Sequence, residues 1–309
     1  MIVQDTMTAA RPPWQAADQE YVQADLTTSY APEIGTMISV SFYRTPKVSV
    51  VIPALNEAEN LPYVLPRIPA WIHEVLLVDG HSTDDTVAVA QRLRPDIRII
   101  AQEGRGKGAA LRSGVAAATG EIVVMLDADG STDPAEIPAF VGALLAGADF
   151  AKGSRFLQGA GTTDMPRHRQ IANAMLVALA NVLFHTHFTD ITYGYNAVWN
   201  CRRDALALEI DNWANEIVSN IRVARSGLRV VEIACFEHKR IAGEAKLQAF
   251  PAGWQILKAI LGERLRSLRE ATTVEAVVLA PQPATAEPAG RSQADAISVL
   301  YERALGEVR

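Results

Sequence analysis

The sequence has few cysteines and no apolar segment long enough to cross a membrane. Its 309 residues include two cysteines, too few for the disulfide framework of a small secreted protein. A membrane span needs about 20 consecutive apolar residues, and the longest candidates, 174–184 and 254–261, are shorter. The N-terminus is mixed and polar, without the apolar core of a secretory signal. We therefore expect a cytoplasmic protein with no transmembrane segment, which contacts a membrane, if at all, only peripherally.

The sequence also lacks an excess of positive charge. It has 29 basic and 35 acidic residues, giving a formal net charge of −6. Nucleic-acid binding depends on positive charge that neutralises phosphates, so this balance argues against nucleic acid as the main partner. Hydrophobic residues make up 49% of the chain, which is enough to bury one large core.

Composition divides the chain into three segments. Residues 1–45 are predicted to be an N-terminal extension, and residues 46–270 a single domain. Within 271–309, the Ala- and Pro-rich stretch 272–294 indicates a linker, and 293–307 indicates a terminal helix. Both ends are candidates for packing on a second copy of the chain, so a homodimer is an open expectation.

Apolar strands alternate with helices in the predicted domain. The expected strands are 48–52 (ended by Pro53), 74–79, 97–100, 121–127 and 228–236. The expected helices are 56–65 (capped by Asn56), 82–92 (capped by Ser82), 107–118, 167–184, 215–226 and 251–268. This alternation predicts an α/β fold whose mostly parallel sheet is flanked by helices on both faces. In such sheets ligands bind outside the carboxyl ends of the strands.

Two aspartates follow the strand 121–127, in the segment Leu126-Asp127-Ala128-Asp129-Gly130. Carboxylates one residue apart at a strand end can reach one hard cation. Mg²⁺ or Mn²⁺ fits, with a diphosphate and water as the remaining ligands. An isolated pair of this kind is more often two solvated turn acids. Here a second strand also ends in an acid, Asp79, so the pattern favours a metal site.

A glycine-rich basic loop, Gly104-Arg105-Gly106-Lys107-Gly108, precedes the helix 107–118. Glycines let backbone amides approach a ligand, and a helix N-terminus beside Lys107 favours an anion. A flexible surface turn explains the same residues equally well. The loop is not a P-loop, because no Ser or Thr follows Lys107. A nucleotidyltransferase would have a glycine-rich basic loop directly after the first strand. The segment that follows that strand here, Pro53-Ala54-Leu55-Asn56, is not such a loop, which argues against this function.

Four separated motifs occur in a definite order along residues 47–262. They are Val48–Glu57, the Asp79 segment, the glycine–lysine loop and the Asp127–Asp129 pair. In this order they resemble the large family-2 glycosyltransferases of the GT-A fold. Three further segments are similar to dolichol-phosphate mannose synthases and bacterial polyprenyl-phosphate sugar transferases: Lys152–Phe156, Asp190–Asn196 and Arg240–Leu247.

The resemblance implies roles for individual residues. The nucleoside of a nucleotide-diphosphate sugar would be lined by Pro53, Leu55, Glu57 and Asp79. The donor diphosphate would be held by Asp127, Ala128, Asp129 and the cation, with Lys107, Arg240 and Lys246 nearby. An acceptor phosphate would meet Arg155 and Arg169, and His238 would be a late metal ligand.

The resemblance also implies an inverting transfer from a donor of the GDP-mannose or UDP-glucose type. A polyprenyl phosphate acceptor is already ionised, whereas a small hydroxylated acceptor needs a general base, for which Glu216 and Asp190 are candidates. The absence of membrane spans favours the hydroxyl acceptor, and the two arginines favour the phosphate. A third hypothesis, a non-catalytic nucleotide-sugar-binding module, predicts broken metal acids, and both are present.

Overall fold

A computed structural model describes residues 45–243 and 249–279 of the chain. The strands are β1 (Val48–Ala54), β2 (Glu74–Asp79), β3 (Arg98–Ala101), β4 (Ile122–Met125), β5 (Phe150–Ser154), β6 (Gly161–Thr162), β7 (Asn196–Trp199), β8 (Val230–Ala234) and β9 (Phe236–Glu237). The α-helices are α1 (Leu61–Val64), α2 (Thr86–Leu93), α3 (Lys107–Ala117), α4 (Ile137–Leu145), α5 (Arg167–Phe184), α6 (Ala214–Arg225) and α7 (Ala249–Leu279). Short 3₁₀ helices are η2 (Leu65–Arg67), η3 (Pro134–Glu136) and η4 (Asn200–Leu206).

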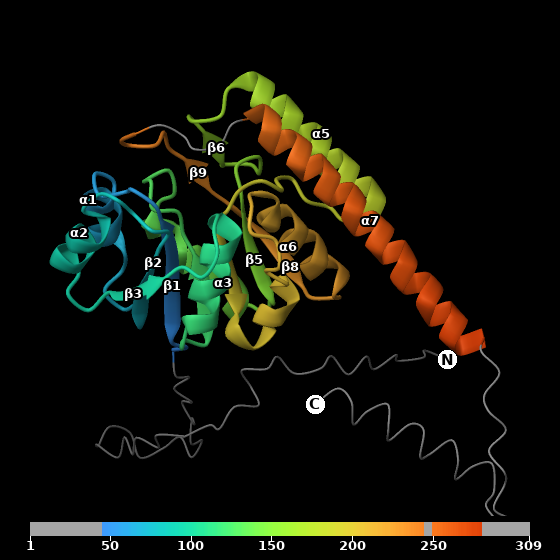
Figure 1. Ribbon diagram of the computed structural model, residues 1–309, viewed down its shortest axis with the longest axis horizontal. Helices are drawn as coiled ribbons and strands as arrows, with labels where there is room; N and C mark the ends of the chain where they lie inside the picture. The colour runs from blue at the N-terminus through green and yellow to red at the C-terminus, as the bar shows by residue number, and fades with distance from the viewer. Residues whose placement is uncertain (1–44, 244–248, 280–309) are drawn as a thin grey trace, which may run out of the picture. The chain divides into compact units, whose positions relative to one another are not determined.

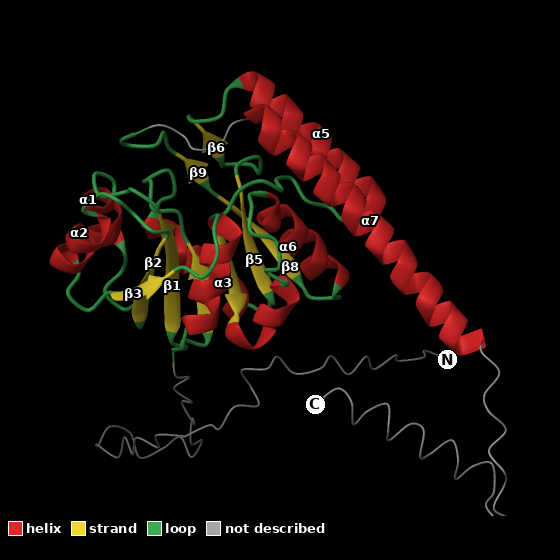
Figure 2. Ribbon diagram, viewed as in Figure 1, coloured by secondary structure: helices red, strands yellow, loops and turns green. Residues whose placement is uncertain are grey.

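Seven strands form one sheet in the order β3-β2-β1-β4-β7-β5-β8. All neighbouring pairs are parallel except those of β7, which runs antiparallel to both β4 and β5. A separate parallel pair joins β6 to β9. In Figure 2 the strands of the main sheet lie among the red helices, with α3 across β1 and β2.

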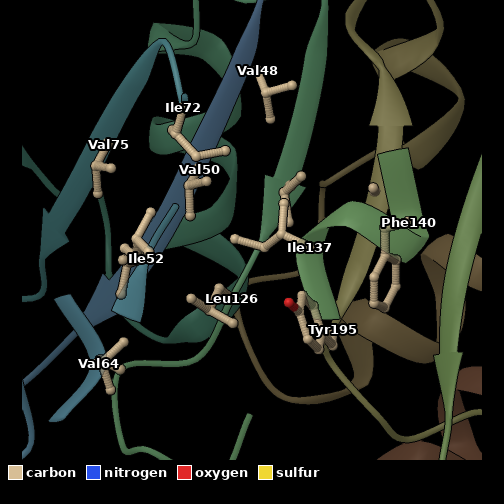
Figure 3. Packing of buried hydrophobic residues seen from close by; sticks show 14 of the residues in the cluster. Val48, Val50, Ile52, Val64, Ile72, Val75, Leu126, Ile137, Phe140 and Tyr195 are labelled. Atoms are coloured by element: carbon tan, nitrogen blue, oxygen red, sulfur yellow. The ribbon is translucent and has the colours of Figure 1, made fainter. Parts of the chain in front are cut away.

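The sheet buries apolar side chains on both faces, as its alternating pattern requires. Val50 and Ile52 point to the face covered by α1, α2 and α4, where Ile137 and Phe140 of α4 belong to the same buried cluster (Figure 3). The intervening Val51 belongs to the opposite face, covered by α3 and α6. The continuous apolar strands of the sequence are therefore explained by burial on two sides.

A smaller apolar cluster joins three helices beside the sheet. Val177 and Ala180 of α5, Ile217 of α6, and Ile256 and Ile260 of α7 are all buried in it. This packing places α5 alongside the first part of α7 (Figure 1).

The first strand is longer than the sequence predicts and the first helix is shorter. β1 continues through Pro53 to Ala54. Proline has no N–H to donate, but this costs no hydrogen bond of the sheet here, because the nitrogen of Pro53 faces β4 and the last β1–β4 pair is at Val51. Asn56 does not cap a helix. It has a positive φ of 50°, and its side-chain oxygen accepts from Thr83 N at 2.7 Å.

The second expected cap also differs. Ser82 Oγ accepts from Asn56 N at 3.0 Å, so it joins two loops. α2 starts only at Thr86, whose N–H donates to Asp84 Oδ1 at 3.0 Å.

Two strands of the main sheet, β5 and β7, were not predicted from the sequence. β5 contains a completely buried lysine, Lys152, which interrupts the apolar pattern that identifies a strand. β7 is a four-residue strand that begins with a polar residue, Asn196. Short strands with polar members carry little periodic signal.

The C-terminal part of the described chain is more helical than expected. α7 runs to Leu279 and so includes the start of the predicted linker 272–294. Within the described residues, the boundary between two compact units falls inside α7, between Arg264 and Leu265. The predicted extension (except its last residue), the rest of the linker and the terminal helix lie outside the described residues. No helix of the described chain is long and apolar enough to cross a membrane.

Gly114 allows α3 to approach the sheet closely. A Cβ at Gly114 would lie 2.3 Å from Val51 Cγ1 and 2.7 Å from Val78 Cγ2. We predict that Gly114→Ala lowers the free energy of unfolding by about 1–3 kcal/mol, because stiff β-branched neighbours must move. Urea denaturation measures the change.

Gly142→Ala in α4 is the matched control, because a Cβ there meets nothing within 4 Å. It should be neutral, or stabilising by up to about 1 kcal/mol from helix propensity. Equal losses in both variants would contradict the close packing of α3.

Candidate active site

A large pocket opens at the carboxyl edge of the sheet, with a volume of about 1220 Å³. The ends of β1, β2 and β4 reach it through Ala54, Gly80 and Asp127. The predicted site residues that line it are Pro53, Leu55, Glu57, Lys107, Asp127, Ala128, Asp129, Arg155, Arg169, Glu216 and Arg240. The structure therefore brings together side chains from most of the domain at one edge.

Lys107 links two carboxylates on one side of the pocket. Its Nζ lies 2.7 Å from Asp127 Oδ1 and 2.6 Å from Glu216 Oε1. The ammonium also lies 5.5 Å from the centre of the Trp213 ring. Burial raises the pKa of Asp127 to about 6; Lys107 opposes the rise, and the carboxylates of Glu216 and Asp129 add to it.

Glycines of the glycine-rich loop allow the close backbone packing that positions Lys107. Gly108 N donates to Asp211 O at 3.0 Å, and a Cβ at Gly108 would lie only 1.9 Å from Ile210 O. Gly106 has φ 92°, and a Cβ there would lie 2.2 Å from Asp211 O. These glycines let segment 210–212 pack directly against the start of α3, where it precedes Trp213. Lys107 is thereby fixed in the pocket.

Arg240 links two further carboxylates on the other side of the pocket. Its guanidinium pairs with Glu57, and its Nη1 lies 3.3 Å from Asp129 Oδ2. Ser131 N and Oγ donate to Asp129 Oδ1 at 3.0 and 2.7 Å, so this carboxylate is oriented from its own loop.

The backbone beside Arg240 pairs with the aspartate loop. Ile241 N donates to Asp129 O at 3.2 Å, and His238 N donates to Ser131 O at 2.9 Å. Gly130 has φ 80°, and a Cβ there would lie 2.4 Å from Ile241 Cδ1. The positive φ is what favours a glycine after the aspartates, because other side chains rarely adopt this backbone conformation.

The charges of this cluster suit a divalent cation. Four carboxylates and two basic side chains take part in the ion pairs just described, so acidic groups outnumber basic ones within these pairs. Asp127 and Asp129 both line the pocket and offer the oxygen ligands that Mg²⁺ and Mn²⁺ prefer. Within the described ranges no three Asp, Glu, His or Cys side chains converge as a metal site. Other ligands would have to come from substrate or water.

Asp190 is not a candidate base, which corrects the prediction. It is completely buried and does not line the pocket. Its Oδ2 and Oδ1 accept from Arg155 Nε and Nη2 at 2.6 and 3.0 Å. Burial alone would raise the pKa of Asp190, but Arg155 and Lys152 lower it to about 2. A carboxylate this acidic and enclosed cannot take a proton from an acceptor, and its task is to hold Arg155.

Arg155 is itself almost fully buried, although it lines the pocket. Besides Asp190, it donates to Glu237 Oε1 at 3.0 Å and to Thr192 Oγ1 at 2.8 Å. Its guanidinium also lies over the Tyr193 ring, 4.8 Å from the ring centre. Its contact with an acceptor phosphate stays a prediction.

Two other predicted site residues, Asp79 and His238, lie outside the pocket lining. The carboxylate of Asp79 accepts from Ser82 N at 3.3 Å and closes its own turn. His238 is exposed, and its ring lies 5.0 Å from that of Phe236, so the structure does not support it as a metal ligand. Lys246 lies outside the described residues.

Two pocket residues, Trp213 and Asn173, were not predicted as site residues. Trp213 precedes α6 and faces Lys107. Asn173 of α5 donates to Asp190 Oδ1 at 3.3 Å and accepts from Thr192 Oγ1 at 2.8 Å. The only signal for Asn173 was a polar residue on the apolar face of a predicted helix.

The chain is similar in sequence to known glycosyltransferases. A family model described as glycosyl transferase family 2 matches residues 49–206. An uncharacterized glycosyltransferase of Mycobacterium tuberculosis is 35% identical, over 65% of this chain and 89% of its own. A polyprenol monophosphomannose synthase of Mycolicibacterium smegmatis is 31% identical, over 66% and 82% of the two chains.

A solved structure has a similar fold. It is glucosyl-3-phosphoglycerate synthase from Mycobacterium tuberculosis, in complex with Mn²⁺, uridine-diphosphate-glucose and phosphoglyceric acid. The TM-score is 0.56 at 24% sequence identity, covering 71% of this chain and 80% of that one.

The buried pair of Asp190 and Arg155 generates a prediction about stability. Asp190→Asn should lower the free energy of unfolding by about 3 kcal/mol, because it leaves a buried guanidinium without its main counter-charge. The Asp190 carboxyl has a lowered pKa in the folded state, so its contribution is complete above its ordinary pKa of 3.8 and is lost towards pH 2. The difference between wild type and variant, measured by urea denaturation, should therefore shrink across that interval.

Asp204→Asn is the control, because Asp204 is fully exposed and lies 4.0 Å from Arg203 Nε. It should leave stability unchanged. A stable Asp190→Asn variant at neutral pH would contradict the role given to this pair.

Proposed function

Because this chain belongs to glycosyl transferase family 2, and is a glycosyltransferase of the predicted GT-A fold, we propose that it transfers a hexose from a nucleotide-diphosphate sugar to a polyprenyl phosphate. The observation that carries the proposal is the division of the pocket. One half holds the paired aspartates with Lys107 and Arg240, and the other joins basic and apolar side chains of α5 to Ile256 of α7.

The donor half suits a diphosphate that leaves with its nucleotide. Mg²⁺ or Mn²⁺ held by Asp127 and Asp129 would act as a Lewis acid that stabilises the charge of the leaving group. Lys107 and Arg240 stand beside these carboxylates and add positive charge in a partly buried place, where it counts for more than in water. Glu57 holds Arg240, and Pro53 and Leu55 line the neighbouring wall for the nucleoside.

The donor sugar is proposed as mannose or glucose, on GDP or UDP. The named relatives support this choice: one is a monophosphomannose synthase, and the solved structure contains uridine-diphosphate-glucose. The acceptor attacks the anomeric carbon from the face opposite the leaving diphosphate, so the proposed transfer inverts that centre.

The acceptor half suits an anionic head with an apolar tail. His168 and Arg169, in the first turn of α5, line the pocket and can bind a phosphate. Further along the same wall lie Ala172, Leu176 and, from α7, Ile256. This sequence of basic and then apolar side chains matches a polyprenyl phosphate. Polyprenyl phosphates also occur in the names of several relatives.

A second candidate acceptor is a small hydroxylated molecule, and Glu216 is the observation that favours it. Glu216 lines the pocket with its carboxylate held by Lys107, so a base is available where a hydroxyl would need one. The solved structure of similar fold, that of another protein, contains phosphoglyceric acid, which is a small hydroxylated molecule.

Replacement of the metal-binding acids tests the donor site. Asp127→Asn and Asp129→Asn should each reduce transfer by about a hundredfold or more, because both remove charge that holds the cation. Product is measured by mass spectrometry with GDP-mannose or UDP-glucose, Mn²⁺ and a short-chain polyprenyl phosphate.

Asp96→Asn is the matched control, since Asp96 is exposed and paired with Arg94 at 3.4 Å. It should transfer at the wild-type rate. Unchanged turnover in Asp127→Asn would remove the proposed donor site. If no GDP or UDP sugar raises the Tm of the wild type with Mn²⁺ present, the donor class is wrong.

Glu216→Gln separates the two acceptor classes. With a polyprenyl phosphate the variant should keep turnover within about tenfold, because the nucleophile is already ionised. With a hydroxyl acceptor turnover should fall by about 10²–10⁴, the usual contribution of a general base. A hundredfold loss on the phosphate acceptor would show that Glu216 takes part in that transfer as well.

A further inference from the structure

Two neighbouring helices carry large apolar side chains on their surface. Ile171, Met175 and Val182 of α5 are 63%, 69% and 73% exposed. They follow the helical spacing i, i+4 and i+11, so they lie along one stripe. Single exposed apolar residues are ordinary, but a continuous stripe marks a contact surface.

The first part of α7 continues this apolar surface. Trp254 and Leu261, seven residues apart and so on one side of the helix, are 59% and 47% exposed. The buried cluster that includes Val177 and Ile256 packs the two helices together, as Figure 1 shows. The exposed residues of both helices therefore belong to one region of the molecule.

The charge of these helices is opposite in sign to that of the whole chain. α5 contains no acidic residue and begins with Arg167, His168 and Arg169. From Ala249 to Arg264, α7 contains one acid, Glu263, which is buried and paired with Arg222 at 2.6 Å. Lys258 lies over the Trp254 ring at 5.2 Å, so an exposed cation and an exposed indole stand together.

We propose that α5 and the part of α7 up to Arg264 form a docking surface for an anionic lipid bilayer. Apolar side chains on a helix without exposed acids enter the boundary between headgroups and acyl chains, while Arg and Lys bind lipid phosphates. Trp254 has the amphipathic ring that is favoured at this depth.

The surface is continuous with the acceptor half of the pocket. Ala172 and Leu176 line the pocket on the same helix that exposes Ile171 and Met175, and Ile256 does so beside Trp254. A lipid acceptor could therefore pass from the bilayer towards Asp127 along these two helices. This last step rests on the proposed function, whereas the docking itself does not.

A second copy of the chain fits the surface less well. Two such surfaces would bring Arg167, Arg169 and Lys258 of one copy against the same residues of the other. The described part of the surface offers no exposed acid to pair with them. Like charges that face each other oppose association, whereas anionic lipid supplies the missing counter-charge.

Flotation with vesicles tests the proposal, without nucleotide sugar present. The wild type should float with phosphatidylcholine vesicles that contain phosphatidylglycerol, and much less with pure phosphatidylcholine. Trp254→Glu and Met175→Glu should each lower the partition coefficient by about tenfold, because each places a negative charge in the interface. Met175→Glu serves if the Trp254 variant has a lowered Tm.

Trp71→Glu is the matched control, because Trp71 is 52% exposed in the loop before β2, outside these helices. It should bind vesicles like the wild type, and so should Asp127→Asn, in which transfer is lost for another reason. The proposal would be overturned if the wild-type protein did not bind anionic vesicles, or if Trp71→Glu lost as much vesicle binding as Trp254→Glu. A lipid-free dimer that Trp254→Glu converts to monomer in sedimentation would assign the surface to a second copy instead.

Discussion

The ion pairs that Lys107 and Arg240 make with four carboxylates hold the pocket together. Lys107 joins Asp127 to Glu216, and Arg240 joins Asp129 to Glu57, so each cation connects an aspartate to an acid from a distant part of the chain. Without these cations, four carboxylates could not stay close together in a partly buried place. The close backbone contacts at Gly106 and Gly108 keep Lys107 in place, and the backbone bond from Ile241 N to Asp129 O ties the Arg240 segment to the aspartate loop. Asp127 and Asp129, oriented by these pairs, line the pocket and offer carboxylate oxygens of the kind that Mg²⁺ and Mn²⁺ prefer.

A second set of buried charges supports the acceptor side. Arg155 is enclosed by Asp190 and Glu237, and Asn173 of α5 bonds to the same aspartate. Lys152 is completely buried beneath them. Burial lowers its pKa, with the carboxylates of Asp190 and Glu232 opposing the change. These buried groups join the start of α5 to the sheet. They therefore hold in place the part of α5 that carries His168 and Arg169.

Much of the fold could be read from the sequence, because its parallel strands are buried on both faces and contain little but Val, Ile and Leu. The range of α5 was predicted to the residue, and β2 likewise. The polar strands β5 and β7 were missed, since Lys152 and Asn196 are tolerated only through tertiary partners. The aspartate pair could be located because both acids follow a strand end with one residue between them. The roles of Asp190 and Glu216 could not be separated, since one faces a buried arginine and the other the pocket, and only long-range packing decides between them.

In the proposed reaction, a donor site of paired ions adjoins an acceptor wall that continues onto an apolar, basic surface. The proposal depends above all on Asp127 and Asp129 together binding the cation that neutralises a nucleoside diphosphate. Anomalous diffraction from a crystal grown with Mn²⁺ and GDP or UDP locates that cation. We expect one Mn²⁺ peak in contact with both carboxylates and with the diphosphate. A peak elsewhere in the pocket, or a bound nucleotide with no Mn²⁺ at these aspartates, would contradict the proposal.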